Sequence, residues 1–261
     1  MESKLTGGNL IPINLEGKRA VVTGGGRGIG REIAVSLAEA GADVCITARS
    51  RDQLEATADL IGKKGKKALI VEGDARLPET ADKVIAKTVE EFAGIDILVN
   101  NAGMEMMKPL FDCGPQDFDR VMDVNVKSMV MFTKAAGGPM KNQNYGRVVN
   151  MASTGSYIAG PRQSLYHASK AACAHFTKAT AIEWARYGIT VNAIAPGWID
   201  TELISHLTED REKLDKYLKA VPLRRLGKPE EIGPTAAFLC SDLSGYMTGT
   251  VVVIDGGLMI P

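Results

Sequence analysis

The sequence predicts a doubly wound α/β fold, in which helices cover both faces of one parallel β-sheet. Seven short runs rich in β-branched residues are continuously apolar, which is typical of strands that are covered on both faces. Amphipathic segments of helical period lie between these runs, so strand and helix alternate along the chain. The expected strands are residues 19–24, 43–48, 68–73, 95–100, 147–152, 189–194 and 250–255. The expected helices lie near residues 28–40, 51–63, 79–92, 116–136, 163–187, 202–219 and 229–241.

Local signals mark the ends of several elements. The first strand runs into the glycine-rich turn TGGGRGIG at 23–30, and the helix REIAVSLAEAG follows it. Ser50-Arg51-Asp52-Gln53 fits a capping box at the start of the second helix. The basic run GKKGKK at 62–67 is interpreted as a solvated loop before the third strand. Pro229-Glu230-Glu231 places a proline and two acids in the first turn of the last helix.

Length and charge restrict the class of protein. The chain has 261 residues, of which 45% are apolar and 24% are charged, so one domain with a large buried core is expected over residues 1–261. Lys and Arg together number 31, as do Asp and Glu, which removes the broad positive field that nucleic acids or anionic membranes attract. No apolar run of about 18 residues occurs. We therefore expect neither a nucleic-acid nor a membrane partner.

The four cysteines indicate a reducing environment. They are Cys45, Cys113, Cys173 and Cys240, and they form no CxxC motif or Cys/His cluster, so no metal site is predicted. The first residues, MESKLTGGNLIPINLEG, lack the apolar core of a secretion signal. A cytoplasmic location is the expectation.

The glycine-rich turn predicts a dinucleotide site. Glycines between a strand and a helix let the backbone approach a pyrophosphate, and the helix N-terminus offers free N–H groups. This placement is the context that a Rossmann-type nucleotide turn requires. The candidate binding residues are Gly24, Arg27, Gly28, Ile29 and Gly30.

Further polar motifs follow the later strands in order. They are Asn100-Asn101-Ala102-Gly103, Asn125, Ser153, Tyr166 with Lys170, and Pro196-Gly197. Together with the TGxxxGxG spacing of the turn, they resemble the short-chain dehydrogenase/reductase family over nearly the whole chain. The resemblance implies an oxidoreductase with a nicotinamide cofactor, similar to 3-oxoacyl reductases and sugar-acid dehydrogenases. It further implies cofactor contacts from Asp74 and Ala75 at the adenine, from Asn101, Ala102, Gly103, Pro196 and Gly197, and from Ile199 and Thr201 at the nicotinamide carboxamide.

The end of the second strand predicts NADP(H) rather than NAD. An acidic residue at this point would accept hydrogen bonds from the ribose 2′-OH, but here Arg49 follows the strand. A guanidinium binds a 2′-phosphate with charge-assisted hydrogen bonds, and Arg27 resembles a second basic residue of NADP-preferring members. Asp52 is the nearby acid that would favour NAD, but it lies inside the expected capping box.

Tyr166 and Lys170 form the expected catalytic centre with Ser153. Residues four apart share one face of a helix, and Ser153 ends an apolar strand where ligands of open α/β sheets bind. Reduction of a ketone requires a proton on oxygen, which a phenol can donate. Lys170 and the oxidised nicotinamide, both cationic, are expected to lower the pKa of Tyr166. Ser153 would hold the carbonyl oxygen.

Three further residues bear on this centre. By resemblance, Asn125 would hold a water that connects Lys170 to solvent. Ser156 is an alternative to Ser153, although the spacing of Ser153 matches the family better. His167 is expected to face away from the tyrosine, because one residue along a helix turns the side chain by about 100 degrees.

The substrate is the least determined feature. Residues 198–225 correspond to the substrate lid of family members, and Met104, Met106 and Met107 either line an apolar pocket or fill the core. Arg147 and Arg186 are displaced from the arginine positions of carrier-protein-linked reductases, which favours a small ketone, keto-sugar or sugar acid over a 3-oxoacyl thioester. A non-catalytic NADP-sensing protein is the other alternative, but such proteins typically lose the tyrosine or the lysine. The resemblance implies a homotetramer.

Overall fold

The computed structural model describes residues 12–204 and 211–260. It contains one sheet of seven parallel strands in the order β3-β2-β1-β4-β5-β6-β7. The order reverses between β1 and β4, where Val21 pairs with Leu98. The strands are β1 (Arg19–Thr23), β2 (Asp43–Thr47), β3 (Ala68–Ile70), β4 (Ile97–Asn100), β5 (Gly146–Met151), β6 (Ile189–Pro196) and β7 (Val251–Ile254). The predicted doubly wound α/β fold is confirmed.

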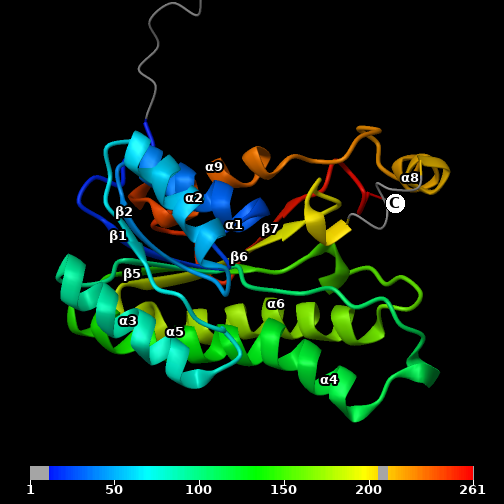
Figure 1. Cartoon of the computed structure of the whole chain (residues 1–261), viewed down its shortest axis with the longest axis horizontal. Helices are drawn as coiled ribbons and strands as arrows, with labels where there is room; N and C mark the ends of the chain where they lie inside the picture. Colours follow the sequence, from blue (N-terminus) through cyan, green and yellow to red (C-terminus); the bar gives the residue numbers. More distant parts are fainter. Residues whose placement is uncertain (1–11, 205–210, 261) are drawn as a thin grey trace, which may run out of the picture.

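Helices form a layer on each face of the sheet (Figure 1). One layer contains α1 (Gly28–Glu39), α2 (Arg51–Lys63) and α9 (Gly233–Cys240). The other contains α3 (Pro78–Phe92), α4 (Pro115–Met122), α5 (Ser128–Asn142) and α6 (Ser164–Trp184). The short helix α8 (Arg211–Leu218) lies beyond the carboxyl end of β6. None of the helices in residues 12–204 and 211–260 has the length and hydropathy of a membrane span.

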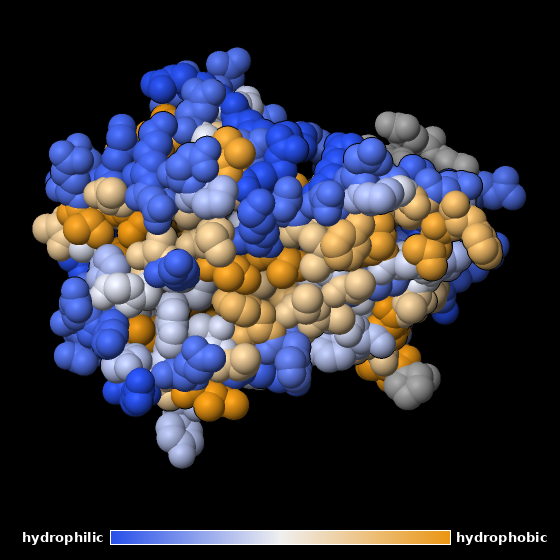
Figure 2. Space-filling model, turned by 90° about the horizontal axis from the view of Figure 1, so that it is seen from below, coloured by the Kyte–Doolittle hydropathy of each residue, from blue (hydrophilic) through white to orange (hydrophobic). Residues whose placement is uncertain are grey.

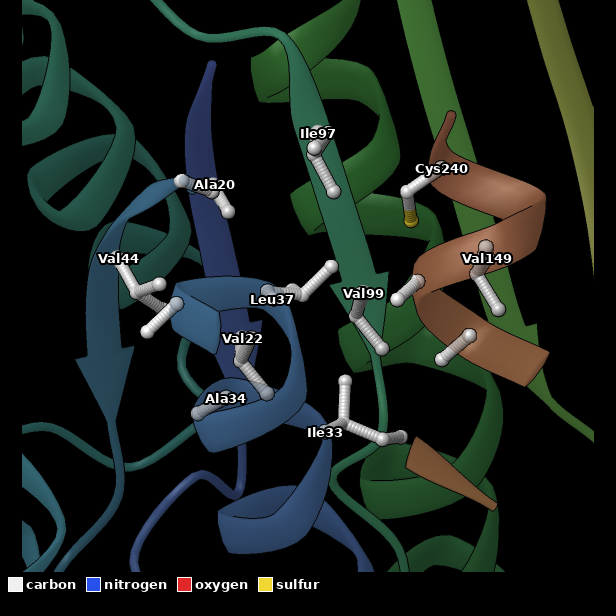
Figure 3. Packing of buried hydrophobic residues seen from close by; sticks show 14 of the residues in the cluster. Ala20, Val22, Ile33, Ala34, Leu37, Val44, Ile97, Val99, Val149 and Cys240 are labelled. Atoms are coloured by element: carbon white, nitrogen blue, oxygen red, sulfur yellow. The ribbon is translucent and has the colours of Figure 1, made fainter. Parts of the chain in front are cut away.

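Two hydrophobic clusters, one on each face of the sheet, explain why the strand sequences are mostly apolar. Successive side chains of a strand point to opposite faces, so Ala20 and Val22 pack under α1, whereas Val21 packs toward α3 and α5. Figure 3 shows Ile33, Ala34 and Leu37 of α1 close to Val22 and Val99 of the sheet. Both faces of the central strands are therefore buried, so a ligand reaches this part of the sheet at the ends of the strands.

The fourth predicted helix is interrupted. The sequence predicts one helix over 116–136, but the structure has α4, then a π-helical turn at Asp123–Lys127, then α5. The π-helical turn widens the backbone by one residue per turn and buries Asn125. The extra residue turns this side chain toward the β4–α4 loop.

Other boundaries also differ from the prediction. The expected helix over 202–219 consists of a 3-10 turn at Glu202–Ile204 and α8, and residues 205–210 lie outside the described part. The last helix begins with a 3-10 turn at Pro229–Glu231, before α9. Ser50 is the N-cap of α2, but its side chain makes no capping hydrogen bond, so the predicted capping box is wrong. In the predicted basic loop, Lys64 pairs with Glu39 and Lys66 with Glu16.

Candidate active site

A cavity of about 820 Å³ opens at the carboxyl edge of the sheet. It is lined by the β1–α1 turn, the ends of β2, β4, β5 and β6, and the first two turns of α6. In an open α/β sheet, ligands bind at the carboxyl ends of the strands, at the point where the strand order reverses. All the predicted cofactor and catalytic residues line the cavity except Asn125: Gly24, Arg27, Gly28, Ile29, Gly30, Arg49, Asp74, Ala75, Asn101, Ala102, Gly103, Ser153, Tyr166, Lys170, Pro196, Gly197, Ile199 and Thr201.

The glycine-rich turn is tight enough to require glycine. Gly24 and Gly28 have φ values of 65° and 52°, in the left-handed region that disfavours larger residues. A Cβ atom on Gly30 would lie 2.2 Å from the carbonyl oxygen of Gly24. Asn101 closes the turn from the β4 side, because its Nδ2 donates to the carbonyl oxygens of Thr23 and Gly24 at 3.0 and 3.2 Å. The turn therefore brings the start of α1 directly to the cavity wall.

Several charged side chains line this cavity. Arg49 is exposed at the end of β2, and Arg27 forms an ion pair with Glu202. The Asp74 carboxylate accepts from the Arg76 guanidinium at 2.6 Å, and this hydrogen bond holds the pKa of Asp74 below its usual value. Asp52 is in the first turn of α2 and does not line the cavity.

Tyr166, Lys170 and Ser153 lie close together in the wall of the cavity. Tyr166 and Lys170 are one turn apart on α6, and Lys170 Nζ lies 5.9 Å from the centre of the Tyr166 ring. The same Nζ donates to the carbonyl oxygen of Met151 at 2.7 Å, which fixes the ammonium at the end of β5. The side chain of Ser153 makes a hydrogen bond with Tyr166, and its Oγ accepts from the backbone N–H of Gly155 at 3.0 Å.

Burial dominates the proton affinities of this centre. It raises the pKa of Tyr166 to about 12, opposed by the hydrogen bond with Ser153 and reinforced by the negative charge of Glu105. Burial also lowers the pKa of Lys170. The sequence predicted an acidic phenol from Lys170 together with the oxidised nicotinamide. Lys170 by itself does not offset burial, so the protein groups alone keep Tyr166 protonated at neutral pH.

Asn125 clamps the loop that follows β4. Its Oδ1 accepts from the N–H of Met104 at 2.8 Å, and its Nδ2 donates to the carbonyl oxygen of Met104 and to Ser169 Oγ, both at 2.9 Å. A Cβ atom on Gly103 would lie 3.5 Å from both Asn125 Oδ1 and Lys170 Nζ. Asn125 Oδ1 and Lys170 Nζ therefore lie close to the same backbone position. The role of Asn125 in holding a water stays a prediction.

Ser156 and His167 were the two other polar residues considered near the catalytic tyrosine, and the structure places each of them differently. The Ser156 hydroxyl donates to the carbonyl oxygen of Lys170 at 2.8 Å, which directs it to the helix backbone. His167 was expected to face away but lines the same cavity as Tyr166, so that expectation is wrong. The loop before α6 folds over this side, and the N–H of Gly160 donates to His167 Nδ1 at 3.3 Å. Burial lowers the pKa of His167, which favours the neutral ring.

Comparisons with known proteins agree with this geometry. A family model described as enoyl-(acyl carrier protein) reductase matches residues 24–259. The 3-oxoacyl-(acyl-carrier-protein) reductase FabG of Aquifex aeolicus is 39% identical over 249 residues, which cover 95% of this chain and 100% of the relative. The oxidoreductase UcpA of Salmonella typhimurium is 41% identical over 254 residues, covering 95% and 96%. The chain belongs to the short-chain dehydrogenase/reductase family.

A solved structure of this family carries a bound nucleotide. The crystal structure of a gluconate 5-dehydrogenase from Burkholderia cenocepacia, in complex with NADP and tartrate, superposes with a TM-score of 0.91. Its sequence is 34% identical, and the match covers 95% of this chain and 98% of that one. The chain is therefore an NAD(P)-dependent dehydrogenase/reductase of the short-chain family.

Several cavity residues of this short-chain dehydrogenase/reductase were missed by the sequence analysis. Glu105 and Gln163 are hydrogen-bonded to each other, and Arg76 pairs with Asp74. Glu105 lies between Met104 and Met106, and in the stretch 104–107 only the methionines were singled out. Met104 and Met107 line the cavity, whereas Met106 does not. An acid between two pocket-lining methionines was the available signal.

The predicted lid contributes to the cavity from several points. Trp198, Leu203 and Tyr217 line it, and the Trp198 and Tyr217 rings meet edge to face with centres 4.9 Å apart. This aromatic contact joins the end of β6 to α8. Residues 205–210 of the predicted lid lie outside the described part of the chain.

Proposed function

We propose that the protein transfers a hydride between NADP(H) and the carbonyl or secondary alcohol group of a small ketone, keto-sugar or sugar acid. The observation that carries this proposal is the grouping of Ser153, Tyr166 and Lys170 in the cavity that also contains the glycine-rich turn. A proton donor, a hydroxyl that can hold an oxygen and an ammonium are the groups that carbonyl reduction requires beside a hydride source.

The residues present fit a phosphorylated dinucleotide. There is no room for a Cβ atom at Gly30, so the glycine-rich turn packs tightly against the start of α1. The N-cap of α1 is Arg27, whose side chain makes no capping bond, which leaves the first N–H groups of the helix for a phosphate. Arg49 stands where an NAD-binding acid would be, and gluconate 5-dehydrogenase of B. cenocepacia binds NADP. Arg27 and Arg49 would hold the 2′-phosphate.

The mechanism follows from the positions of three side chains. NADPH, when bound, would supply the hydride for the carbonyl carbon. Ser153 holds the carbonyl oxygen by a hydrogen bond, and Tyr166 gives its proton to that oxygen, so the carbonyl becomes a secondary alcohol. Lys170, held by Met151, stabilises the phenolate that remains until a proton from solvent restores the phenol. Asn125 keeps the β4–α4 loop against this centre through Met104.

A 3-oxoacyl thioester bound to an acyl carrier protein is the second candidate substrate, because FabG of A. aeolicus is 39% identical to this chain. The position of Arg147 argues against a carrier-docking role for it. Its side chain is buried, donates to Asp242 at 3.0 Å and stacks on the Tyr145 ring at 4.3 Å. Arg186 is exposed but lies over the Tyr187 ring at 4.7 Å. The Arg147 guanidinium is therefore not presented as a free basic side chain, whereas that of Arg186 remains exposed.

An assembly of four copies fits the apolar surface of the second helix layer. Figure 2 shows apolar residues gathered across this face. A hollow between α5 and α6 is lined by Val130, Phe176 and Trp184, and Ile182 beside it is 82% exposed. Exposed apolar patches of this kind are typical of protein–protein contacts. The proposal therefore includes a homotetramer in the cytoplasm, formed through α5, α6 and β7.

The test is a substrate panel followed by the loss of NADPH absorbance. Small ketones, keto-sugars, keto-acids derived from sugars and 3-oxoacyl thioesters are each offered with NADPH and, separately, with NADH. We expect turnover of at least one free ketone and faster turnover with NADPH. Tight NADPH binding without turnover of any carbonyl would instead identify a non-catalytic sensor. Turnover confined to acyl thioesters would favour the second candidate.

A further inference from the structure

We propose that His167 is a positioning residue, whose imidazole ring holds the loop between β5 and α6 so that Ser153 keeps its place beside Tyr166. The ring acts on this loop at two points, Gly155 and Gly160. The inference rests on the proposed function, because Ser153 is the hydroxyl that would hold the carbonyl oxygen. It assigns a task to a cavity histidine that the mechanism does not use.

The first support is a hydrogen bond at the far end of the loop. The N–H of Gly160 donates to His167 Nδ1 at 3.3 Å, so Nδ1 is the ring nitrogen that carries no proton. An imidazole accepts in this way only when it is neutral, because both nitrogens are donors in the charged ring. Residues 157–159, just before Gly160, are exposed. The hydrogen bond therefore ties an exposed stretch of the loop back to α6.

The second support is the contact between the ring and Gly155. A Cβ atom on Gly155 would lie 2.7 Å from His167 Cδ2 and 3.4 Å from Ser153 Oγ. The edge of the imidazole and the serine hydroxyl therefore lie close to the same point beside Gly155. The N–H of Gly155 donates to Ser153 Oγ at 3.0 Å, and Ser153 in turn makes a hydrogen bond with Tyr166. If the ring were absent, Gly155 could shift and would carry the Ser153 hydroxyl with it.

The third support is that the loop has a separate attachment, so that loss of the ring changes the structure locally. The Ser156 hydroxyl donates to the carbonyl oxygen of Lys170 at 2.8 Å. His167 and Lys170 are three residues apart on α6, a spacing that places them on one side of the helix. Without the imidazole, Ser156 would still join the loop to α6, whereas Gly155 and Gly160 would lose their contacts with the helix. A variant of His167 should therefore fold.

The charge of the ring decides whether the loop is held. Burial lowers the pKa of His167 below its ordinary value of 6.5, which favours the neutral form that accepts from Gly160. Protonation would place an N–H at Nδ1 against the N–H of Gly160, so this hydrogen bond is lost as the pH falls through the pKa of His167. The titratable groups of the loop are Tyr157 and Arg162, and those that line the cavity from neighbouring elements are Glu105, which is hydrogen-bonded to Gln163, and Arg120, Tyr166, Lys170 and Tyr217.

The experiment compares His167→Leu, which removes the acceptor, with His167→Asn, whose Oδ1 can accept in place of Nδ1. A displacement of about 1 Å at a reacting group costs up to about a hundredfold in rate. We expect His167→Leu to lower kcat for ketone reduction about tenfold to a hundredfold with a smaller change in KM, because Ser153 acts on charge that develops in the transition state. His167→Asn should restore kcat. His175→Leu, at an exposed histidine of the same helix, is the matched control and should leave both constants unchanged.

The pH profile is a second readout, which a purely structural role of the side chain would not change. Wild type should lose kcat as the pH falls from about 7 to about 5, because the ring becomes charged. The amide of His167→Asn does not titrate, so this variant should lose less over the same range. Identical profiles in the two proteins would contradict the role of the neutral ring.

A double-mutant cycle tests whether the ring acts through Ser153. His167→Leu should cost much less in a Ser153→Ala background than in wild type, because the hydroxyl that the ring positions is then absent. The same fold-loss in both backgrounds, with wild type active, overturns the inference and leaves the proposed function standing.

A different outcome would identify failure of the proposed function itself. If wild type turns over no ketone, that function fails, and amide hydrogen exchange then decides the inference. The N–H groups of Gly155 and Gly160 are bound to Ser153 Oγ and to His167 Nδ1. Both should exchange faster in His167→Leu than in wild type, and His167→Asn should restore the protection. Unchanged exchange at Gly155 in His167→Leu would show that the ring does not hold the group that binds Ser153.

Discussion

Replacing Gly30 with alanine tests the phosphate-binding turn directly. The added Cβ atom would lie 2.2 Å from the carbonyl oxygen of Gly24 and 2.4 Å from Asn101 Nδ2. Carbon contacts are favourable at about 3.5–4.0 Å, so both neighbours are more than about 1 Å too close. One of them is backbone, which moves only if the turn moves. The other is an amide that holds the turn to β4.

The size of the effect follows from these two contacts. Overpacking in a close-packed site costs about 1–3 kcal/mol. Displacing the Asn101 amide also breaks its hydrogen bonds to Thr23 and Gly24, each contributing about 0.5–1.5 kcal/mol. We therefore expect Gly30→Ala to lower the free energy of unfolding by about 2–6 kcal/mol. NADPH affinity should fall at least tenfold, about the contribution of one charged hydrogen bond.

Urea unfolding and NADPH fluorescence titration measure the two effects. Gly62→Ala is the matched control, because Gly62 lies in α2 and nothing is within 4 Å of its added Cβ. Alanine is favoured over glycine in a helix by up to about 1 kcal/mol, so this variant should be unchanged or slightly more stable. If Gly30→Ala binds NADPH as tightly as Gly62→Ala does, the turn does not hold the cofactor.

Three further predictions concern cofactor choice and pH. Arg49→Asp should change the ratio of the Kd values for NADP⁺ and NAD⁺ tenfold or more in favour of NAD⁺, because a carboxylate repels the 2′-phosphate. Calorimetry measures both Kd values, and an unchanged ratio would show that Arg49 does not bind the 2′-phosphate. Glu202→Gln frees Arg27 from its ion pair and should tighten NADP⁺ binding by up to about fivefold, the effect of an exposed pair, without changing NAD⁺ binding; weaker NADP⁺ binding would contradict this. Since burial raises the pKa of Tyr166 from its ordinary value of 10.0 to about 12, the folded chain keeps a proton that the unfolded chain loses, and stability falls as the pH rises through this window. Wild type should therefore lose about 2 kcal/mol more than Tyr166→Phe between pH 10 and 12 in urea unfolding, and equal losses would show that the phenol is not buried as described.

The sheet and its nucleotide turn were predictable because they depend on local pattern. A strand buried on both faces is apolar at most positions, as β1, β5 and β6 are, and the buried Asn150 and Asn192 are hydrogen-bonded. The turn is equally local, since the close approach of Gly30 to Gly24 spans six residues of chain. Such features need no knowledge of distant residues.

The parts that escaped prediction depend on contacts between distant residues. The π-helical turn at Asp123–Lys127 interrupts a sequence whose helical period is continuous, and the bonds of Asn125 to Met104 and Ser169 accompany the interruption. Glu105 and Gln163 are 58 residues apart in the chain, so their pairing is visible only after folding. His167 was misplaced because helix geometry gives the direction of a side chain but not the extent of the cavity around it.

The most direct test of the account is single-turnover reduction of a ketone by Tyr166→Phe with NADPH bound. Removing a positioned proton donor should slow hydride transfer by about a hundredfold to ten-thousandfold, while the Kd for NADPH stays close to that of wild type. Hydride transfer at the wild-type rate in this variant would show that the Tyr166 hydroxyl does not supply the proton, and the proposed mechanism would be wrong.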